Sequence, residues 1–228
     1  SEAVATAIAS TDKPVVAYDT NIDSDKCLAF VGTGNKEAAK EGAKAAVEAA
    51  KANGWDEIKC IEIAGVQGDS TNTARMDGYR EGITEAGGEL LDNETQYANA
   101  TADLAVTAME GIMSKYPDGV AIICSNNDDM ALGAINALVN AGYNLPGGEG
   151  CTVIPVFGVD ATEAAKELIA NKQMTGSIKQ DAEGMADAVA TITANLIEGK
   201  DKFEGLNENY EVVDGWTVNI PYSVYTGE

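Results

Sequence analysis

The feature that most constrains the fold is a regular alternation of short apolar runs with Ala-rich helical segments. Runs such as "VVAY" (15–18), "GVAIIC" (119–124) and "VIPVFGV" (153–159) are rich in Val and Ile, and predicted helices such as 37–54 and 181–198 separate them. This alternation is typical of a parallel sheet covered by helices on both faces. Near-continuous apolar strands also fit burial on both sides. The sequence therefore predicts an α/β fold with doubly wound parallel sheets.

The charge of the chain excludes several classes of function. A formal charge of −22 at pH 7 opposes binding to nucleic acid or to an anionic membrane face. The chain contains no His, so it lacks the usual general base at neutral pH and the commonest metal ligand. We expect no cofactor and no metal, and the short segment before the strand at 57–65 has too few oxygen ligands for a calcium loop.

The four cysteines show no Cys-x-x-Cys spacing. Cys60 and Cys124 fall inside apolar runs, so buried free thiols are the simpler interpretation and a disulfide is the alternative. The spacing therefore leaves the disulfide state and the redox compartment open. The four residues are Cys27, Cys60, Cys124 and Cys151.

Polar residues follow several predicted strands directly, and ligands of parallel sheets bind beyond the carboxyl ends of the strands. These residues are carboxylates, amides and one Arg, without a nucleophile and base together. Such a set can bind a molecule rich in hydroxyl groups but is poorly suited to catalysis. The positions are Asp19, Gln67 to Arg75, Asn126 to Asp129, Asp160 and Gln180.

Each of these residues also has a purely structural interpretation. Asp128 is predicted to be the N-cap of the helix that follows it, and Asp160 could equally cap the helix at 161–171. Arg75 could lie on a solvated helix face, and Gln180 could be an ordinary loop residue. Because all of them lie at strand ends, we favour the interpretation that they bind a ligand over the separate structural interpretations.

Two stretches carry a resemblance to a known family: "SNNDDMALGAINAL" (125–138) and the segment 154–200, which begins "IPVFGVDATEAAKELIANK". Together they resemble the type I periplasmic sugar-binding proteins of ABC importers, with the galactose/glucose-binding members closest and the ribose-binding members next. The resemblance implies two doubly wound lobes, joined by three hinge strands, that close on a sugar. We expect the C-terminal lobe to comprise 33–179 and 217–228, and 1–32 with 181–216 to form the N-terminal lobe.

The resemblance also implies a set of sugar-binding residues and partners. The family's positions fall on Asp19, Arg75, Asn127, Asp160 and Gln180, while Asp69 and Thr71 occupy further positions at which this chain differs from the galactose-binding pattern. The implied partners are a monosaccharide, the membrane subunits of an ABC importer and, as an additional candidate, a chemoreceptor. A monomer is expected, in the periplasm or as a lipoprotein on the surface of a Gram-positive cell.

The chain departs from the family pattern at its beginning. Family members have further strands and helices before a segment like residues 1–20, so we expect an incomplete N-terminal lobe in a truncated or proteolysed chain. Helix 181–198 should then leave much of its apolar face uncovered. Three alternative functions stay open: a ribose or other pentose binder, the sugar-sensing domain of a LacI-type repressor, and an α/β enzyme.

Overall fold

The computed structural model describes residues 2–22 and 24–227, so Ser1 and Glu228, the outer bounds of the predicted lobes, lie outside it together with Asp23. The described chain divides into two units. The smaller unit contains the residues up to Gly34 together with Gln180–Tyr222, and the larger contains Asn35–Lys179 together with the segment from Ser223. The chain therefore passes from one unit to the other three times. The last passage follows Tyr222, whereas the expected boundary lies after residue 216.

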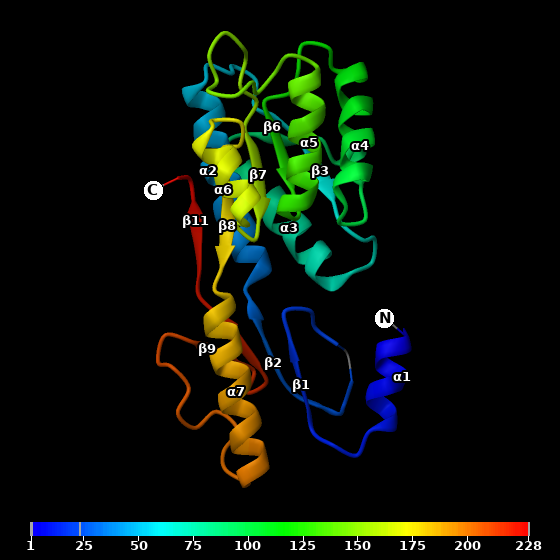
Figure 1. Ribbon diagram of the computed structural model, residues 1–228, viewed down its shortest axis with the longest axis vertical. Coiled ribbons are helices and arrows are strands. Elements are labelled where there is room, and N and C mark those ends of the chain that lie inside the picture. Colours follow the sequence, from blue (N-terminus) through cyan, green and yellow to red (C-terminus); the bar gives the residue numbers. More distant parts are fainter. Residues whose placement is uncertain (1, 23, 228) are drawn as a thin grey trace. The chain divides into compact units, whose positions relative to one another are not determined.

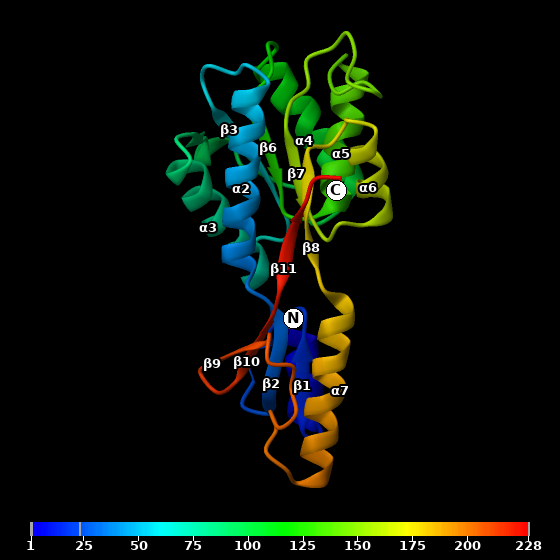
Figure 2. The same cartoon turned by 90° about the vertical axis from the view of Figure 1, so that its left-hand side faces the viewer.

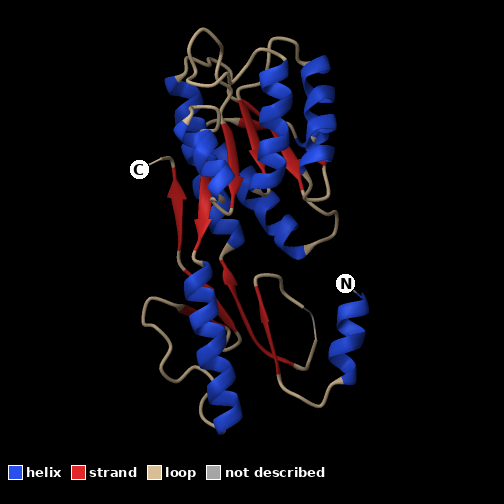
Figure 3. Cartoon of the chain, in the orientation of Figure 1, coloured by secondary structure: helices blue, strands red, loops and turns tan. Residues whose placement is uncertain are grey.

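The larger unit is built on a seven-stranded sheet with the order β11-β8-β7-β6-β3-β4, in which β5 also pairs with β3 (Figure 1, Figure 3). The pairs β3–β6, β6–β7 and β7–β8 are parallel, as expected for strands that alternate with helices. The strands are β3 (Lys59–Ala64), β4 (Glu89–Leu90), β5 (Gln96–Tyr97), β6 (Ile122–Ser125), β7 (Val156–Val159), β8 (Gly176–Gln180) and β11 (Tyr222–Tyr225).

Helices cover both faces of this sheet, which confirms the predicted doubly wound class. In Figure 2, α2 and α3 lie on one side of the strands, and α4, α5 and α6 lie on the other. On the second side, Ile63 and Ile123 of the strands pack with Met130 and Leu138 of α5 and Met109 of α4 in one apolar core. The helices are α2 (Asn35–Ala52), α3 (Ser70–Glu85), α4 (Ala102–Lys115), α5 (Asp128–Asn140) and α6 (Glu163–Ala170), with a 3₁₀ helix η1 (Asp92–Glu94).

Two glycines allow α3 to pack closely on α2. A Cβ atom at Gly78 would lie 2.1 Å from the backbone oxygen of Lys36, and one at Gly82 would lie 2.3 Å from that of Lys40. These contacts are far shorter than any side chain tolerates, so the two helices touch through their backbones. This packing fixes the position of α3, whose first turns carry most of the candidate site.

The smaller unit has a four-stranded sheet with the order β1-β2-β10-β9. Met185, Ala188 and Ile192 of α7 pack on one face of it against Val31 and Val218, while Ile8 of α1 packs in a separate cluster with Phe30. Because β10 pairs with β2, residues 217–222 belong to this unit and not, as expected from the sequence, to the larger one. The helix α1 was not predicted. The elements are α1 (Glu2–Ser10), β1 (Val15–Tyr18), β2 (Cys27–Thr33), α7 (Ala182–Glu198), β9 (Glu211–Val213) and β10 (Thr217–Ile220).

The other side of α7 carries apolar residues that the smaller unit leaves exposed. Ile197 is 78% exposed, and Ala186 and Ala190 are also exposed. Within the described residues, no helix combines the length and the apolar character that a membrane crossing requires.

Candidate functional site

A polar pocket of about 210 Å³ opens in the larger unit beyond the carboxyl ends of β3 and β6. This is the edge of a parallel sheet at which ligands are expected. The pocket brings together four predicted site residues: Asp69, Thr71, Arg75 and Asn127. We call it the polar pocket; it is lined by Gly65, Val66, Asp69, Thr71, Asn72, Arg75, Ala100, Asn126, Asn127 and Met130.

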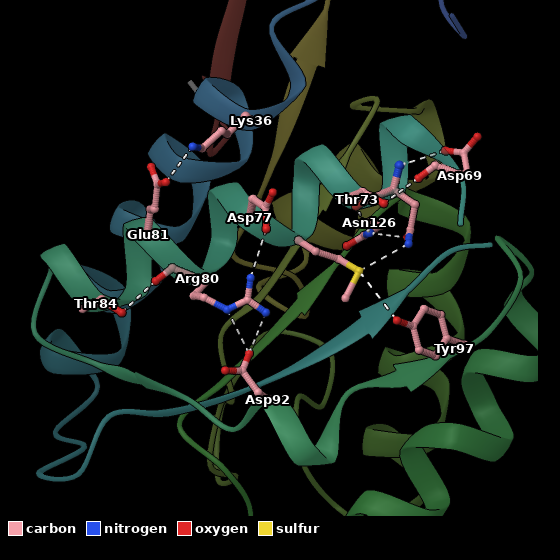
Figure 4. A network of polar contacts seen from close by, with 12 residues as sticks. Lys36, Asp69, Thr73, Asp77, Arg80, Glu81, Thr84, Asp92, Tyr97 and Asn126 are labelled. Atoms are coloured by element: carbon pink, nitrogen blue, oxygen red, sulfur yellow. Dashed lines mark hydrogen bonds and ion pairs between the residues drawn. The ribbon is translucent and has the colours of Figure 1, made fainter. Parts of the chain in front are cut away.

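The first turn of α3 forms one wall of the polar pocket. Asp69 is the N-cap of α3, and its Oδ1 accepts a hydrogen bond from the backbone N–H of Asn72 at 2.8 Å. The backbone oxygen of Asp69 accepts a further bond from the Thr73 hydroxyl (Figure 4). An Asp N-cap stabilises a helix by about 1 kcal/mol relative to Ala, so Asp69 has a structural role whatever it binds.

Arg75 is buried in the wall of the polar pocket, and only 9% of it is exposed. Its Nε donates to Asn35 Oδ1 at 2.9 Å, and its Nη1 donates to the backbone oxygen of Asn126. The interpretation of Arg75 as a solvated surface residue is therefore wrong. One helix turn further along α3, the buried Tyr79 hydroxyl donates to the backbone oxygen of Ser125 at 2.7 Å. Arg75 and Tyr79 thus both hold α3 to the end of β6.

The start of α5 forms another wall, and here the predicted cap was wrong. Asn127 is the N-cap: its Oδ1 accepts from the backbone N–H of Met130 at 2.9 Å. Its Nδ2 makes only a long contact of 3.4 Å with the Ala100 oxygen. The side-chain oxygen of Asn127 therefore caps α5, while its amide hydrogens make no short hydrogen bond to the described residues and can donate to a ligand in the pocket.

Asp128, which was predicted to be the cap, is fully buried and supports the loop after β7 instead. Its two carboxyl oxygens accept hydrogen bonds from the Ser177 hydroxyl at 2.7 Å and from the backbone N–H of Thr162 at 2.8 Å. Burial raises the pKa of Asp128, and these two donors oppose that rise. Gly158 is needed beside it, because a Cβ there would lie 2.3 Å from Asp128 Oδ1.

The loop held by Asp128 carries Asp160 in a strained backbone conformation. Asp160 has a φ of 114° and Ala161 a φ of 50°. Such angles are uncommon for residues other than glycine and often accompany functional sites. Thr162, rather than Asp160, is the N-cap of α6, so the capping interpretation of Asp160 is wrong. Asp160 does not line the polar pocket.

The smaller unit contains the two remaining predicted residues. Asp19 follows β1 with a φ of 60° and lines a separate apolar pocket of about 460 Å³ with Tyr18 and residues of α7 such as Met185. Gln180, at the end of β8, donates from Nε2 to the Thr33 hydroxyl at 3.0 Å. Gln180 is thus tied to the end of β2 rather than being an unattached loop residue.

Two pocket residues, Asn72 and Asn126, belong to the polar stretches that follow strands, but they are absent from the set of sugar-binding residues that the resemblance implies. Asn126 Nδ2 donates to Asn72 Oδ1 at 2.6 Å, and Figure 4 shows Asn126 within the network of polar contacts around α3. No spacing rule separates these two residues from their neighbours. Tyr97, at the end of β5, is 43% exposed and does not line the polar pocket. Its hydroxyl lies 3.9 Å from Met76 Sδ.

Comparison with known proteins gives three kinds of likeness. Residues 1–201 match the family model of the periplasmic binding protein domain. The D-galactose/methyl-galactoside binding periplasmic protein of Haemophilus influenzae is 35% identical over 111 residues, which is 49% of this chain and 30% of that protein. The ribose import binding protein of Bacillus subtilis is 26% identical over 203 residues, which is 88% of this chain and 61% of that protein.

A solved structure extends the comparison to the fold. The ABC transporter solute-binding protein of Clostridium phytofermentans, with bound β-D-glucose, superposes with a TM-score of 0.79 at 19% identity, covering 98% of this chain and 73% of that one. This likeness concerns the fold alone, and the matches to the two curated relatives span less than two thirds of either relative's length. The family match covers most of the chain and agrees with the two units, each built on a sheet, described above. The chain belongs to the periplasmic binding protein domain family and has the type I fold.

Proposed function

We propose that this protein is an extracytoplasmic solute-binding protein that captures a monosaccharide and delivers it to an ABC importer. A galactose- or glucose-like aldohexose is the proposed ligand, and ribose or another pentose is the alternative. The observation that carries the proposal is the chemistry of the polar pocket. Its lining offers a carboxylate, a hydroxyl, three amides and a guanidinium, which suit the hydroxyl groups of a sugar.

The proposed ligand contacts of the larger unit are Asp69, Thr71, Arg75, Asn127 and Asp160. Asp19 and Gln180, which belong to the smaller unit, are proposed as ligand contacts from the family resemblance. Support comes from the backbone: Asp19 and Asp160 each follow a strand with φ in the left-handed region, at 60° and 114°. Residues held in such conformations cluster at active sites and ligand clamps.

The same chemistry argues for binding without turnover. The polar pocket contains no Ser–His or Cys–His pair, because the chain has no His and the described lining includes no Cys. We propose that the protein acts as a monomer in transport. Its proposed partners are the membrane subunits of the importer and, as an additional candidate, a chemoreceptor. The location is the periplasm or, as a lipoprotein, the outer surface of a Gram-positive cell.

Titration calorimetry of the protein with D-galactose, D-glucose, D-ribose and L-arabinose tests the proposal. We expect saturable binding of at least one sugar with one site per chain. Asp160→Asn should weaken that binding, because it removes a charged acceptor without changing the shape of the side chain. Glu163→Gln, on the exposed side of α6, is the matched control. Absence of binding to every sugar, or turnover of one of them, would overturn the proposal.

A further inference from the structure

A carboxyl group without a hydrogen-bond partner is buried behind the polar pocket. Glu62 lies in the middle of β3 and is fully buried. Among the described residues, three buried side-chain atoms have no hydrogen-bond partner: both oxygens of Glu62 and Oδ1 of Asn126. All three are acceptors when Glu62 is ionised, and an ionised carboxylate in such surroundings is strongly unfavourable. A protonated Glu62 would instead supply one donor.

The backbone of Gly65 fixes which way the pocket amides point. Its N–H donates to a side-chain atom of Asn72 at 2.5 Å, so that atom must be Oδ1, since a backbone N–H can only donate. The Asn126 atom 2.6 Å from the same oxygen must then be Nδ2, which also lies 3.3 Å from the Asn72 backbone oxygen. Both hydrogens of Asn126 Nδ2 are thus directed to Asn72. Asn126 Oδ1 is left as an acceptor that needs a donor.

Glu62 lies beside Asn126: in the parallel pair of β3 and β6 it stands opposite Cys124, and the backbone N–H of Asn126, two residues further on, donates to the Ile63 oxygen at 3.1 Å. A protonated Glu62 is therefore a candidate for that donor.

Burial raises the pKa of Glu62 to about 8, and the charges of Asp92 and Asp77 support the rise. Burial outweighs the attraction of Arg80 and the contact with the Asn126 amide, both of which lower this pKa. Arg80 is engaged elsewhere, in ion pairs with Asp77 and Asp92. The other titratable groups around Glu62 and its neighbours are Cys60 on the same strand, Cys124 on β6 and Tyr79 on α3.

We propose that Glu62 is a positioning residue of the polar pocket, which carries its proton at neutral pH and donates it to Asn126 Oδ1. The bond holds the Asn126 amide in the orientation in which its Nδ2 donates to Asn72. This contact with Asn72 in turn helps to hold the start of α3 in place. When Glu62 loses its proton, its oxygens and Asn126 Oδ1 repel each other. The amide then turns its Nδ2 to Glu62, and its oxygen faces Asn72 Oδ1, so the network at the pocket wall breaks.

The consequence for sugar affinity rests on the proposed function, whereas the orientation of Asn126 does not. Two measurements without sugar therefore come first. Infrared difference spectra of wild type minus Glu62→Gln should show the carbonyl band of a protonated carboxylic acid at about pH 6 and lose it by about pH 10. The side-chain amide signals of Asn126 in NMR spectra should shift with the same midpoint in wild type and stay constant in Glu62→Gln. The chain has no His, so no imidazole titration overlaps this range.

The third measurement is the affinity for whichever of D-galactose, D-glucose or D-ribose binds. Between about pH 6 and pH 10 the wild-type affinity should fall about tenfold, the ordinary cost of one buried hydrogen bond. The Glu62→Gln variant should lose no affinity, because its amide donates at every pH, and Glu57→Gln, an exposed residue just before β3, should behave as wild type. Absence of the acid band at pH 6, or a pH response of Asn126 that Glu62→Gln shares, overturns the proposal. If no sugar binds, the proposed function fails, and the two sugar-free measurements still decide the role of Glu62.

Discussion

The buried Glu62 should make the stability of the protein depend on pH in an unusual direction. Its pKa in the folded protein is about 8, against 4.5 for an ordinary Glu. Between these two values the folded chain retains a proton that the unfolded chain has released. The free energy of unfolding must therefore fall as pH rises through this window, and the loss is complete above about pH 8.

The size of the effect follows from the shift. Each pKa unit corresponds to about 1.4 kcal/mol, so the loss between pH 4.5 and pH 8 is on the order of 5 kcal/mol. Whole domains are stable by only about 5–15 kcal/mol, so the protein should be markedly less resistant to urea at pH 9 than at pH 5. Glu62→Gln carries no titrating group and should remove this slope, whatever its absolute stability.

Urea unfolding followed by circular dichroism at several values between pH 5 and pH 9 measures the slope directly. Glu57→Gln is the control, because the Lys59 hydrogen bond lowers the pKa of Glu57 and its contribution therefore changes only below this range. Parallel stability curves for wild type and Glu62→Gln would refute the reasoning, since they would mean that Glu62 exchanges no proton on unfolding.

Three further predictions concern other features of the molecule. Asn127→Ala should lower the free energy of unfolding by about 1 kcal/mol through loss of the α5 cap, whereas Asn127→Ser should retain the cap and weaken only sugar binding; equal stability of the two variants in urea would contradict the assigned cap. Asp160→Gly should relieve the strain at φ 114° and be about 1 kcal/mol more stable than Asp160→Ala, while both variants should bind sugar more weakly. Thermal unfolding measures the stability and calorimetric titration the binding, and a Gly variant less stable than the Ala variant would argue against strain. Iodoacetamide should modify Cys151 alone in the folded protein, because the other three cysteines are buried; mass spectrometry counts the labels, and rapid labelling of all four would contradict that burial.

The fold class could be predicted from the sequence because its signal is repeated along the chain. Each apolar run and each Ala-rich segment independently supports the alternation of strand and helix. The short elements β4, β5 and β9 have two or three residues each, too few to show any periodicity. The partner of β10 could not be predicted either, because pairing with β2 depends on contacts between the two ends of the chain.

Local sequence rules could not predict the details of the candidate site. The motif "SNNDDM" predicted a cap at the start of α5 but not which residue forms it, since Asn and Asp are almost equally good caps. The outcome depends on distant groups: Ser177 and Thr162 provide the donors that bind Asp128, which leaves the cap to Asn127. The burial of Arg75 likewise depends on Asn35 and the end of β6, which no pattern around Arg75 reveals.

The three passages of the chain between the units have a consequence for the order of folding. Nearly all of the larger unit is one continuous stretch, from Asn35 to Lys179, while the smaller unit needs segments from both ends of the sequence. Phe30 can pair with Thr217 only after the intervening chain has closed into a loop, and the entropy lost on closure grows with the length of the loop. A folded stretch 35–179 shortens that loop, because only 31–34 and 180–216 and the distance between the ends of the folded stretch remain to be spanned. Amide protons of β3 and β6 should therefore become protected from exchange before those of β2 and β10 when the protein refolds.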